Sequence, residues 1–398
     1  MIRTAAVVGT GLIGTSVALA LTRRGVHVHL LDADESAART AAALGAGTVG
    51  PPTAPADIAV LAVPPGSVGE VLAKQQSNGL ARSYTDVASV KTGPERDVFA
   101  LADPSCYIGG HPMAGRELSG PLAASATLFE GRSWVLTPTP DTATETLNRA
   151  LEVASLCAAV PVVMQSAAHD RAVALVSHTP HLVASLMAAR LEHMPEDASQ
   201  LAGQGVRDVT RIAGGDPRLW GDILDANAAA VADVLQELAV DLTVAVSALR
   251  GLATDDADER AEGLMLVADL LGRGRKGRER VPGKHGEKPS HCTPVHVLIG
   301  DQAGELARLL ATVAELGVNV EEVSIDHSPG ERSGLVELLV EPASAVRMAR
   351  RLTDYGWAVQ RPPGHTGFPA VPTAEPAPRT GPLPAGTAAG RSRAPARG

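Results

Sequence analysis

The glycine-rich segment AAVVGTGLIG at residues 5–14 constrains the fold of this chain more than any other feature. Residues 5–8 are a short apolar run of the kind found in buried parallel strands, and the residues after the glycines have the composition of a helix. A strand, a turn carrying Gly9, Gly11 and Gly14, and a helix together form a cradle for the pyrophosphate of a dinucleotide. The start of the helix adds free N–H groups and a positive dipole end. The sequence therefore predicts a Rossmann-type, doubly wound α/β domain.

The next predicted strand, at residues 26–31, bears on the choice of cofactor. It ends in Asp32, which follows Gly14 at about the spacing of the acidic residue that binds the ribose hydroxyls of NAD. A carboxylate there repels a 2′-phosphate, so NAD is favoured over NADP; the alternative is that Asp32 only ends the strand. The residues predicted to bind NAD are Gly9, Thr10, Gly11, Leu12, Ile13, Gly14, Asp32, Val63, Pro64 and Ser89.

The composition excludes several classes of protein. The chain has 398 residues and 45% hydrophobic content, enough for two or three domains with cores of their own. A formal net charge of −9 argues against binding to nucleic acid. Three scattered cysteines, Cys106, Cys157 and Cys292, fit neither a disulfide framework nor a metal site. The first strand begins almost at once, so we expect no signal peptide. No stretch of 18 or more uncharged apolar residues occurs, so we expect no membrane span, and the scattered cysteines suit a cytoplasmic location.

The chain divides into five segments by its apolar periodicity and its composition. Strand-like and helix-like stretches alternate over residues 1–164, which predicts a mainly parallel sheet with helices on both faces. Residues 165–271 predict an all-α domain, and residues 293–361 predict a small α+β domain of the order βαββαβ. Residues 272–292 form a basic linker, for which polyanion binding is the alternative. Residues 362–398 are rich in Pro, Gly and Ala, so we expect them to be disordered.

Two prolines bear on the helices of the all-α domain. Pro180 removes a backbone donor and predicts a kink in the apolar helix around it. Asp216 and Pro217 predict an N-cap and a first helical position. Apolar residues then recur about every three to four positions from Leu219 to Leu249, which predicts one long amphipathic helix at the core of a homodimer.

Four polar motifs carry groups that a nicotinamide enzyme could use. DVASVK at residues 86–91 follows a predicted strand, at the sheet edge that faces the ligand crevice. In GGHPMAGRE, at residues 109–117, His111 lies in a rigid loop and is a candidate general base. SHTPH at residues 177–181 places two histidines on one helical face, and GQGVRDVTRIA at residues 203–213 offers an arginine for a carboxylate. No third ligand accompanies the two histidines at a suitable spacing, so we predict no metal site.

The order of these motifs is similar to that of a known enzyme family. GTGLIG, DVASVK, GGHPMAGRELSG, SHTPH and DVTRIAGGDPRLW resemble motifs of the prephenate/arogenate dehydrogenases of tyrosine biosynthesis, and the likeness covers residues 1–255. Residues 294–360 resemble an ACT domain, a small regulatory fold that binds amino acids. This second resemblance implies an aromatic amino acid as effector, bound near Asp301, Gly304, Leu306 and Asn319.

The resemblance also implies a reaction and a role for each candidate residue. Hydride would leave ring carbon C4 of a cyclohexadienol for NAD while the ring carboxylate departs as CO₂. His111 would be the base that takes the proton of the C4 hydroxyl, and Ser89 would orient that hydroxyl and the nicotinamide. Arg211 would bind a substrate carboxylate, with His181 as a second polar contact and Trp220 as a wall of the pocket.

The side chain carried by the substrate ring stays open. Glu117 would lie near it and favour the ammonium of arogenate over the keto acid of prephenate; an ion pair with Arg207 or Arg211 is the alternative. Gln204 departs from relatives with glycine at that position and puts the shape of the pocket wall in doubt. We predict a prephenate dehydrogenase, with an arogenate dehydrogenase or a secondary-metabolism dehydrogenase of an amino-substituted prephenate as alternatives. A non-catalytic amino-acid sensor is a further alternative, against which the intact motifs argue.

Overall fold

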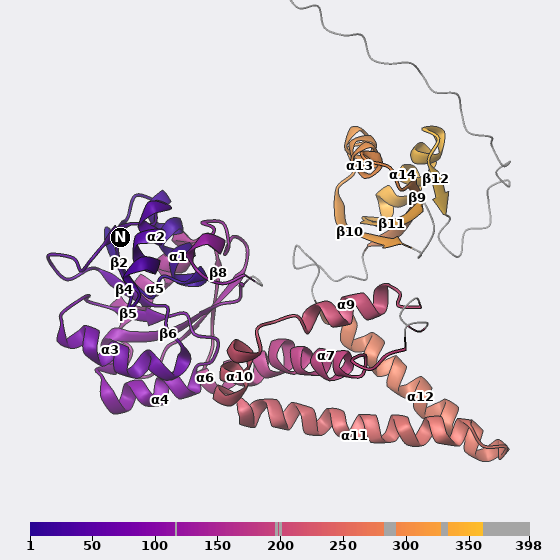
Figure 1. Cartoon of the computed structure of the whole chain (residues 1–398), viewed down its shortest axis with the longest axis horizontal. Coiled ribbons are helices and arrows are strands. Elements are labelled where there is room, and N and C mark those ends of the chain that lie inside the picture. The colour runs from indigo at the N-terminus through magenta and orange to yellow at the C-terminus, as the bar shows by residue number, and fades with distance from the viewer. Residues whose placement is uncertain (116–117, 196–197, 199–200, 282–291, 328–332, 361–398) are drawn as a thin grey trace, which may run out of the picture. The chain divides into compact units, whose positions relative to one another are not determined.

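The computed structural model describes residues 1–115, 118–195, 198, 201–281, 292–327 and 333–360. The chain divides into two units, with the boundary after Val281 (Figure 1). The tail at residues 362–398, which the sequence predicts to be disordered, and most of the predicted linker lie outside the described residues.

The first unit begins with an eight-stranded sheet in the order β3-β2-β1-β4-β5-β6-β7-β8. Neighbouring strands run parallel except for β6 and β7, which pair antiparallel. The reversal of strand order between β1 and β4 is the switch point at which α/β sheets bind ligands. The strands are β1 Thr4–Val8, β2 His27–Leu31, β3 Thr48–Val49, β4 Ile58–Leu61, β5 Tyr84–Asp86, β6 Tyr107–Pro112, β7 Ser133–Thr137 and β8 Val160–Val163.

Helices cover both faces of this sheet, which confirms the doubly wound prediction. The alternation along β1 shows how: Ala5 and Val7 belong to one buried core cluster, and Ala6 and Val8 belong to another. The first cluster includes buried residues of α1, α2 and α5, and the second includes residues of α3 and α4. The helices are α1 Leu12–Arg23, α2 Glu35–Ala43, α3 Val68–Ser77, α4 Thr92–Leu101 and α5 Thr144–Leu156.

The rest of the first unit is helical, as predicted. Asp216 caps α10 by accepting a hydrogen bond from the backbone N–H of Arg218, and Pro217 is the first helical residue. The disturbance predicted at Pro180 takes the form of a π-helical turn, Ala174–His178, just before α7. The helices are α6 Ser166–Val173, α7 Thr179–Ala189, α9 Gln204–Ile212, α10 Pro217–Ala226, α11 Ala228–Leu252 and α12 Ala257–Arg278.

Two predictions about these helices are wrong. The single helix expected from Leu219 to Leu249 is divided at Asn227, which has non-helical dihedral angles and separates α10 from α11. The basic linker does not begin at residue 272, because α12 continues to Arg278. Arg273 of α12 forms an ion pair with Asp241 of α11 at 2.8 Å and also pairs with Asp269, one turn earlier in its own helix.

By length and apolar composition alone, the stretch Ser166–Ala189 could cross a membrane, although it carries the charged residues Asp170 and Arg171. Its polar residues explain its place in this fold. Asp170 accepts hydrogen bonds from Lys91 and Thr92 of the nucleotide-binding region, and His178 contacts Asn227. The stretch therefore lies between the sheet domain and the helical domain, and both contribute to its polar contacts.

The C-terminal unit is a four-stranded antiparallel sheet in the order β10-β11-β9-β12, which confirms the predicted βαββαβ topology. Its core lies on one face, where alternate residues of β9 and β11 join buried residues of both helices. Gly317 has a φ of 63° just after the first helix, the left-handed conformation that a helix C-terminus favours. The elements are β9 Thr293–Gly300, α13 Glu305–Glu315, β10 Val320–His327, β11 Ser333–Val340, α14 Pro342–Asp354 and β12 Ala358–Gln360.

Candidate active site

The turn after β1 has the shape that a dinucleotide requires. Gly9 has a φ of 98°, and a Cβ atom there would overlap the carbonyl oxygen of Ala62. A Cβ atom at Gly14 would overlap the carbonyl oxygen of Gly9, so the helix can lie this close to the strand only with glycine at position 14. Gly11 faces open space, with no atom within 4 Å of its would-be Cβ, and no side chain caps the N–H groups of α1 there. These residues fit the pyrophosphate of NAD.

Asp32 lies at the end of β2, beside this turn. Its carboxylate accepts hydrogen bonds from the Thr10 hydroxyl at 2.7 Å, from the Thr10 backbone N–H and from the Asp34 backbone N–H at 2.9 Å. Burial alone would raise the pKa of Asp32, but these hydrogen bonds lower it below its usual value. Asp32 is therefore an ionised acceptor beside the dinucleotide turn, as recognition of ribose hydroxyls requires.

Ser89 and His111 come from neighbouring strands. Ser89 lies in the loop after β5, and His111 lies in β6, which pairs with β5 in parallel. The buried Asp86 carboxylate joins the two segments, because it accepts from the backbone N–H of Ala88 at 2.7 Å and from that of Gly110 at 3.3 Å. One carboxylate therefore holds Ala88, which precedes Ser89, close to Gly110, which precedes His111.

Lys91 and Tyr107 complete this buried cluster. The Tyr107 hydroxyl donates to Asp86, and the Lys91 ammonium pairs with the same carboxylate and donates to the Gly110 carbonyl oxygen at 2.7 Å. Both Lys91 and Asp86 are at most 1% exposed. The sequence places Lys91 in the DVASVK motif, but only the fold shows that its charge lies beneath His111.

His111 is the first member of a chain of three hydrogen-bonded side chains. His111 Nδ1 lies 2.8 Å from His169 Nε2, and the two rings meet edge to face. His169 Nδ1 lies 2.8 Å from the carboxylate of Asp170. That carboxylate also accepts from the backbone N–H groups of Lys91 and Thr92, both at 2.8 Å, at the start of α4. The only sequence signal for His169 and Asp170 is that they are polar residues within the mostly apolar stretch Ser166–Ala189.

The surroundings of His111 keep it neutral. Burial, and then the charges of Lys91, His169 and His178, lower the pKa of His111 well below 6.5, while Asp170 opposes the shift. Hydrogen bonds outweigh burial at Asp170 and lower its pKa to about 2, so this carboxylate stays ionised. A neutral imidazole is the form that can accept a proton.

The low pKa of His111 leads to an expected pH dependence for a reaction in which this ring acts as the base. Because only the neutral ring acts as a base, we expect kcat/KM to stay constant through neutral pH and to fall as pH drops through a value below 6.5. The pH profile of kcat/KM, measured with saturating NAD, checks this. An acid limb centred above the ordinary histidine pKa would contradict the assignment.

Two further predicted residues meet in the helical domain. The rings of His181 and Trp220 are stacked, with centroids 3.5 Å apart and an interplanar angle of 7°. Gly215 lies against this stack, because a Cβ atom there would be 2.9 Å from His181 Cε1 and would overlap the indole nitrogen. Burial lowers the pKa of His181, so the ring in the stack is neutral at physiological pH.

Two of the other predicted substrate residues, Arg211 and Gln204, lie in α9. Arg211 has an exposed side chain in the last turn of α9. Gln204, in the first turn of α9, donates a hydrogen bond to Asp208 at 2.9 Å and thus pairs within its own helix. Glu117 lies outside the described residues.

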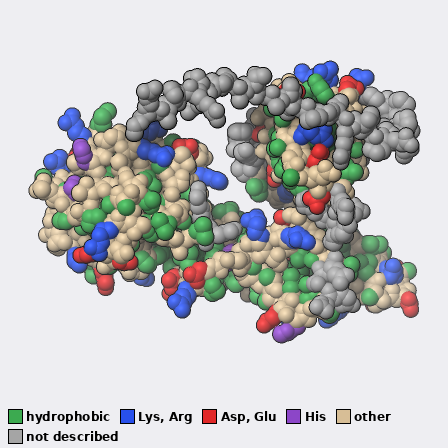
Figure 2. All heavy atoms as spheres, turned by 45° about the horizontal axis from the view of Figure 1, so that its top comes forward, with side chains coloured by type: hydrophobic (Ala, Val, Ile, Leu, Met, Phe, Trp, Pro, Cys, Tyr) green, Lys and Arg blue, Asp and Glu red, His purple; other side chains and the backbone are tan. Residues whose placement is uncertain are grey.

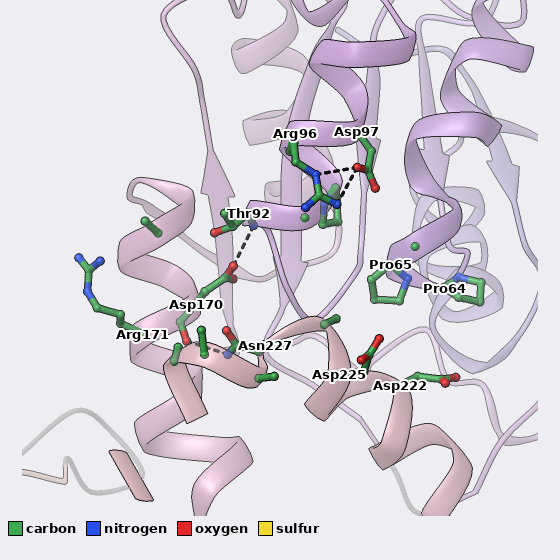
Figure 3. A pocket seen from close by; sticks show the side chains of 18 of the residues that line it. Pro64, Pro65, Thr92, Arg96, Asp97, Asp170, Arg171, Asp222, Asp225 and Asn227 are labelled. Atoms are coloured by element: carbon green, nitrogen blue, oxygen red, sulfur yellow. Dashed lines mark hydrogen bonds and ion pairs between the residues drawn. The ribbon is translucent and has the colours of Figure 1, made fainter. Parts of the chain in front are cut away.

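A cavity of about 840 Å³ lies between the start of α4 and the helices α6, α10 and α11. Figure 3 shows Asp170, Thr92 and Asn227 on its wall, with Pro64 and Pro65 across from them. The Asn227 amide donates to the backbone carbonyl of Asp170 at 2.9 Å and contacts His178 at 3.1 Å. The break between α10 and α11 thus supports the residues beside His111.

Known proteins match most of the sheet domain and the helical domain of this chain. Residues 17–163 match the family described as prephenate dehydrogenase, nucleotide-binding domain, and residues 165–265 match the prephenate dehydrogenase dimerization domain. The chain is 41% identical over 359 residues to the probable prephenate dehydrogenase NovF of Streptomyces niveus, a match that covers 89% of this chain and 99% of that protein.

Two solved structures are also similar. One is prephenate dehydrogenase from A. aeolicus in complex with hydroxyphenyl propionate and NAD+, with 29% identity, a TM-score of 0.59, and 70% of this chain and 98% of that chain covered. The other is Synechocystis arogenate dehydrogenase, with 30% identity, a TM-score of 0.57, and coverage of 69% and 99%. This chain therefore belongs to the prephenate dehydrogenase family of NAD-dependent oxidoreductases.

Proposed function

We propose that the chain converts prephenate to 4-hydroxyphenylpyruvate, with His111 as the base. The observation that carries this proposal is the hydrogen-bonded chain from His111 through His169 to Asp170, on a strand of the same sheet that forms the dinucleotide turn. NAD, when bound, accepts the hydride from C4 of the substrate. Loss of CO₂ from the ring then gives an aromatic product.

The residues of the chain supply the proton chemistry and the positioning. His111 Nε2 takes the proton of the C4 hydroxyl, while its Nδ1 is engaged with His169. Ser89 orients the hydroxyl from the neighbouring loop. His181 and Trp220 form one wall of the substrate site through their ring stack, and Arg211 binds a substrate carboxylate.

The preferred substrate is tested by supplying alternatives directly. We expect the protein with NAD to form NADH from prephenate faster than from arogenate, as followed by NADH absorbance. An amino-substituted prephenate is the third arm of the experiment. A higher kcat/KM for arogenate or for the amino-substituted compound would replace prephenate in the proposal, and no NADH from any of the three would refute the proposed function.

We further propose that the protein is a homodimer formed through its helical domain, as the match to a dimerization domain implies. Hydrophobic side chains reach the surface of the chain (Figure 2). Several of them share a face of one long helix, since Leu238, Leu242 and Leu249 of α11 follow the helical period and are each more than 40% exposed. A second copy that covers this surface would remove it from water.

The C-terminal unit is proposed to be an ACT-like regulatory domain that binds an aromatic amino acid. Its βαββαβ order supports this, as does the turn after β9, where Gly304 has a φ of 94° and precedes α13. Asp301 is exposed in this turn, Leu306 packs against the core, and Asn319 bonds to Glu321 at the start of β10.

Tyrosine inhibition tests this regulatory role. We expect tyrosine to inhibit the full chain and to lose most of its effect on a chain that ends at Val281, where the first unit ends. The measurement is the tyrosine concentration that halves NADH formation in each protein. Equal inhibition of both would place the inhibitory site in the first unit.

A cytoplasmic location is also proposed. Cys106 and Cys157 are free thiols, and Cys157 is buried. Thiols of this kind persist in a reducing compartment.

A further inference from the structure

His169 and Asp170 are buried side chains next to the base. They are 1% and 5% exposed, and both come from α6, whereas His111 comes from β6. Desolvation of such groups costs free energy unless each is hydrogen-bonded, and here each one is. A simple support for the His111 ring would not need a second titratable ring followed by a carboxylate.

The carboxylate determines which nitrogen carries the proton in both rings. Asp170 is ionised and accepts from two backbone N–H groups, so it can only accept from His169 Nδ1. Neutral His169 then has its lone pair on Nε2 and accepts from His111 Nδ1. The free lone pair of His111 is therefore on Nε2, as a base needs.

The charges around the two rings differ. The Lys91 ammonium disfavours a positive charge on the His111 ring, and the Asp170 carboxylate, which bonds to His169 and not to His111, opposes this effect. His169 contacts Asp170 directly, at 2.8 Å, in a site where few water molecules screen the interaction. A positive charge is thus better placed on His169 than on His111.

We propose that His169 receives a proton from His111 during the reaction, so that the developing positive charge lies beside Asp170. This inference rests on the proposed role of His111 as base. His169 does not contact the substrate and is a positioning and proton-accepting residue. Asp170 orients it through the contact with His169 Nδ1 and is itself held by the backbone N–H of Thr92 at the start of α4, as Figure 3 shows.

The protons balance without any added reactant. The C4 hydroxyl proton moves to His111 Nε2, and the Nδ1 proton of His111 moves to His169 Nε2. His111 is then neutral, and His169 is an imidazolium paired with the Asp170 carboxylate. After the product leaves, the proton returns from His169 to His111 Nδ1, and His111 Nε2 releases its proton to water.

Two substitutions of His169 distinguish a role in proton transfer from a role in holding the His111 ring in place. In His169→Gln the side-chain amide can still accept a hydrogen bond from His111 but cannot take up a proton, and we expect kcat to fall about 10²-fold. In His169→Gly we expect a similar fall in kcat. Added imidazole should restore kcat in proportion to the concentration of its neutral form. Wild-type kcat in the glutamine variant, or no reversal in the glycine variant, would overturn the proposal.

A matched control and a measurement independent of turnover complete the test. His27→Gln changes an exposed histidine at the start of β2 and should leave kcat unchanged; an equal loss there would overturn the assignment. Nitrogen NMR of isotope-labelled histidines in the wild-type protein should show His111 and His169 protonated on Nδ1. The opposite tautomer of His111 would overturn the proposed proton transfer from His111 to His169. Absence of NADH formation by the wild type would refute only the proposed function.

Discussion

Replacement of His111 by asparagine should lower kcat by about 10²–10⁴-fold, the range for loss of a general base. The asparagine amide can still reach toward His169 from the position of Nδ1, but it offers no basic nitrogen in place of Nε2. Because the lowered pKa of the partly buried His111 leaves the ring uncharged at neutral pH, its loss removes a proton acceptor and not an ion pair. The measurement is kcat with saturating NAD and substrate.

The affinity for NAD provides the control for this variant. The dinucleotide turn at residues 9–14 is separate from β6 in sequence and has its own contacts, so the Kd for NAD should be unchanged. A variant with wild-type kcat would remove His111 from the role of base. A variant that also fails to bind NAD would show that the substitution disturbed the fold.

Replacement of Lys91 by methionine should lower the free energy of unfolding by about 3–5 kcal/mol, the usual cost of removing one partner of a buried ion pair. Asp86 would keep its neutral hydrogen-bond donors but lose the only charge that compensates it among its described contacts. Urea unfolding at one fixed protein concentration measures the loss, because dimerisation makes apparent stability depend on concentration.

Two further variants make this prediction specific. In the double variant Asp86→Asn with Lys91→Met, no charge is left buried, so part of the lost stability should return. Arg96→Met removes the ion pair between Arg96 and Asp97 of α4, where Arg96 is 78% exposed. This variant should lower the free energy of unfolding by at most about 1 kcal/mol. Equal stability of Lys91→Met and wild type would contradict a structural role for the buried pair.

The local parts of the fold could be predicted from the sequence. The dinucleotide turn depends on three glycines next to a strand, and each glycine is required by backbone contacts within that short segment. The βαββαβ order of the C-terminal unit follows from apolar alternation in β9 and β11. The N-cap at Asp216 involves a hydrogen bond across only two residues. Short-range patterns of this kind do not depend on the rest of the chain.

The errors in the helical domain come from contacts between distant residues. Apolar spacing runs through Asn227 without interruption, but the Asn227 side chain bonds to Asp170 and His178, and the helix divides there. The segment after residue 271 has the composition of a linker, but Arg273 pairs with Asp241 of the neighbouring helix and α12 continues. Helix propensity is a weak signal, and tertiary contacts such as these override it.

The candidate site also combines local features that the sequence predicts with contacts that only the fold creates. The sequence by itself determined the cofactor turn, Asp32 and the motif that contains His111, because each is a local pattern with a recognisable chemical purpose. Only the tertiary structure decided what surrounds His111: Lys91 and Asp86 beneath it, and His169 with Asp170 from a helix 58 residues further along the chain. The burial and the charges around His111 arise at that meeting point, and no spacing in the sequence encodes a contact between two elements that only folding brings together.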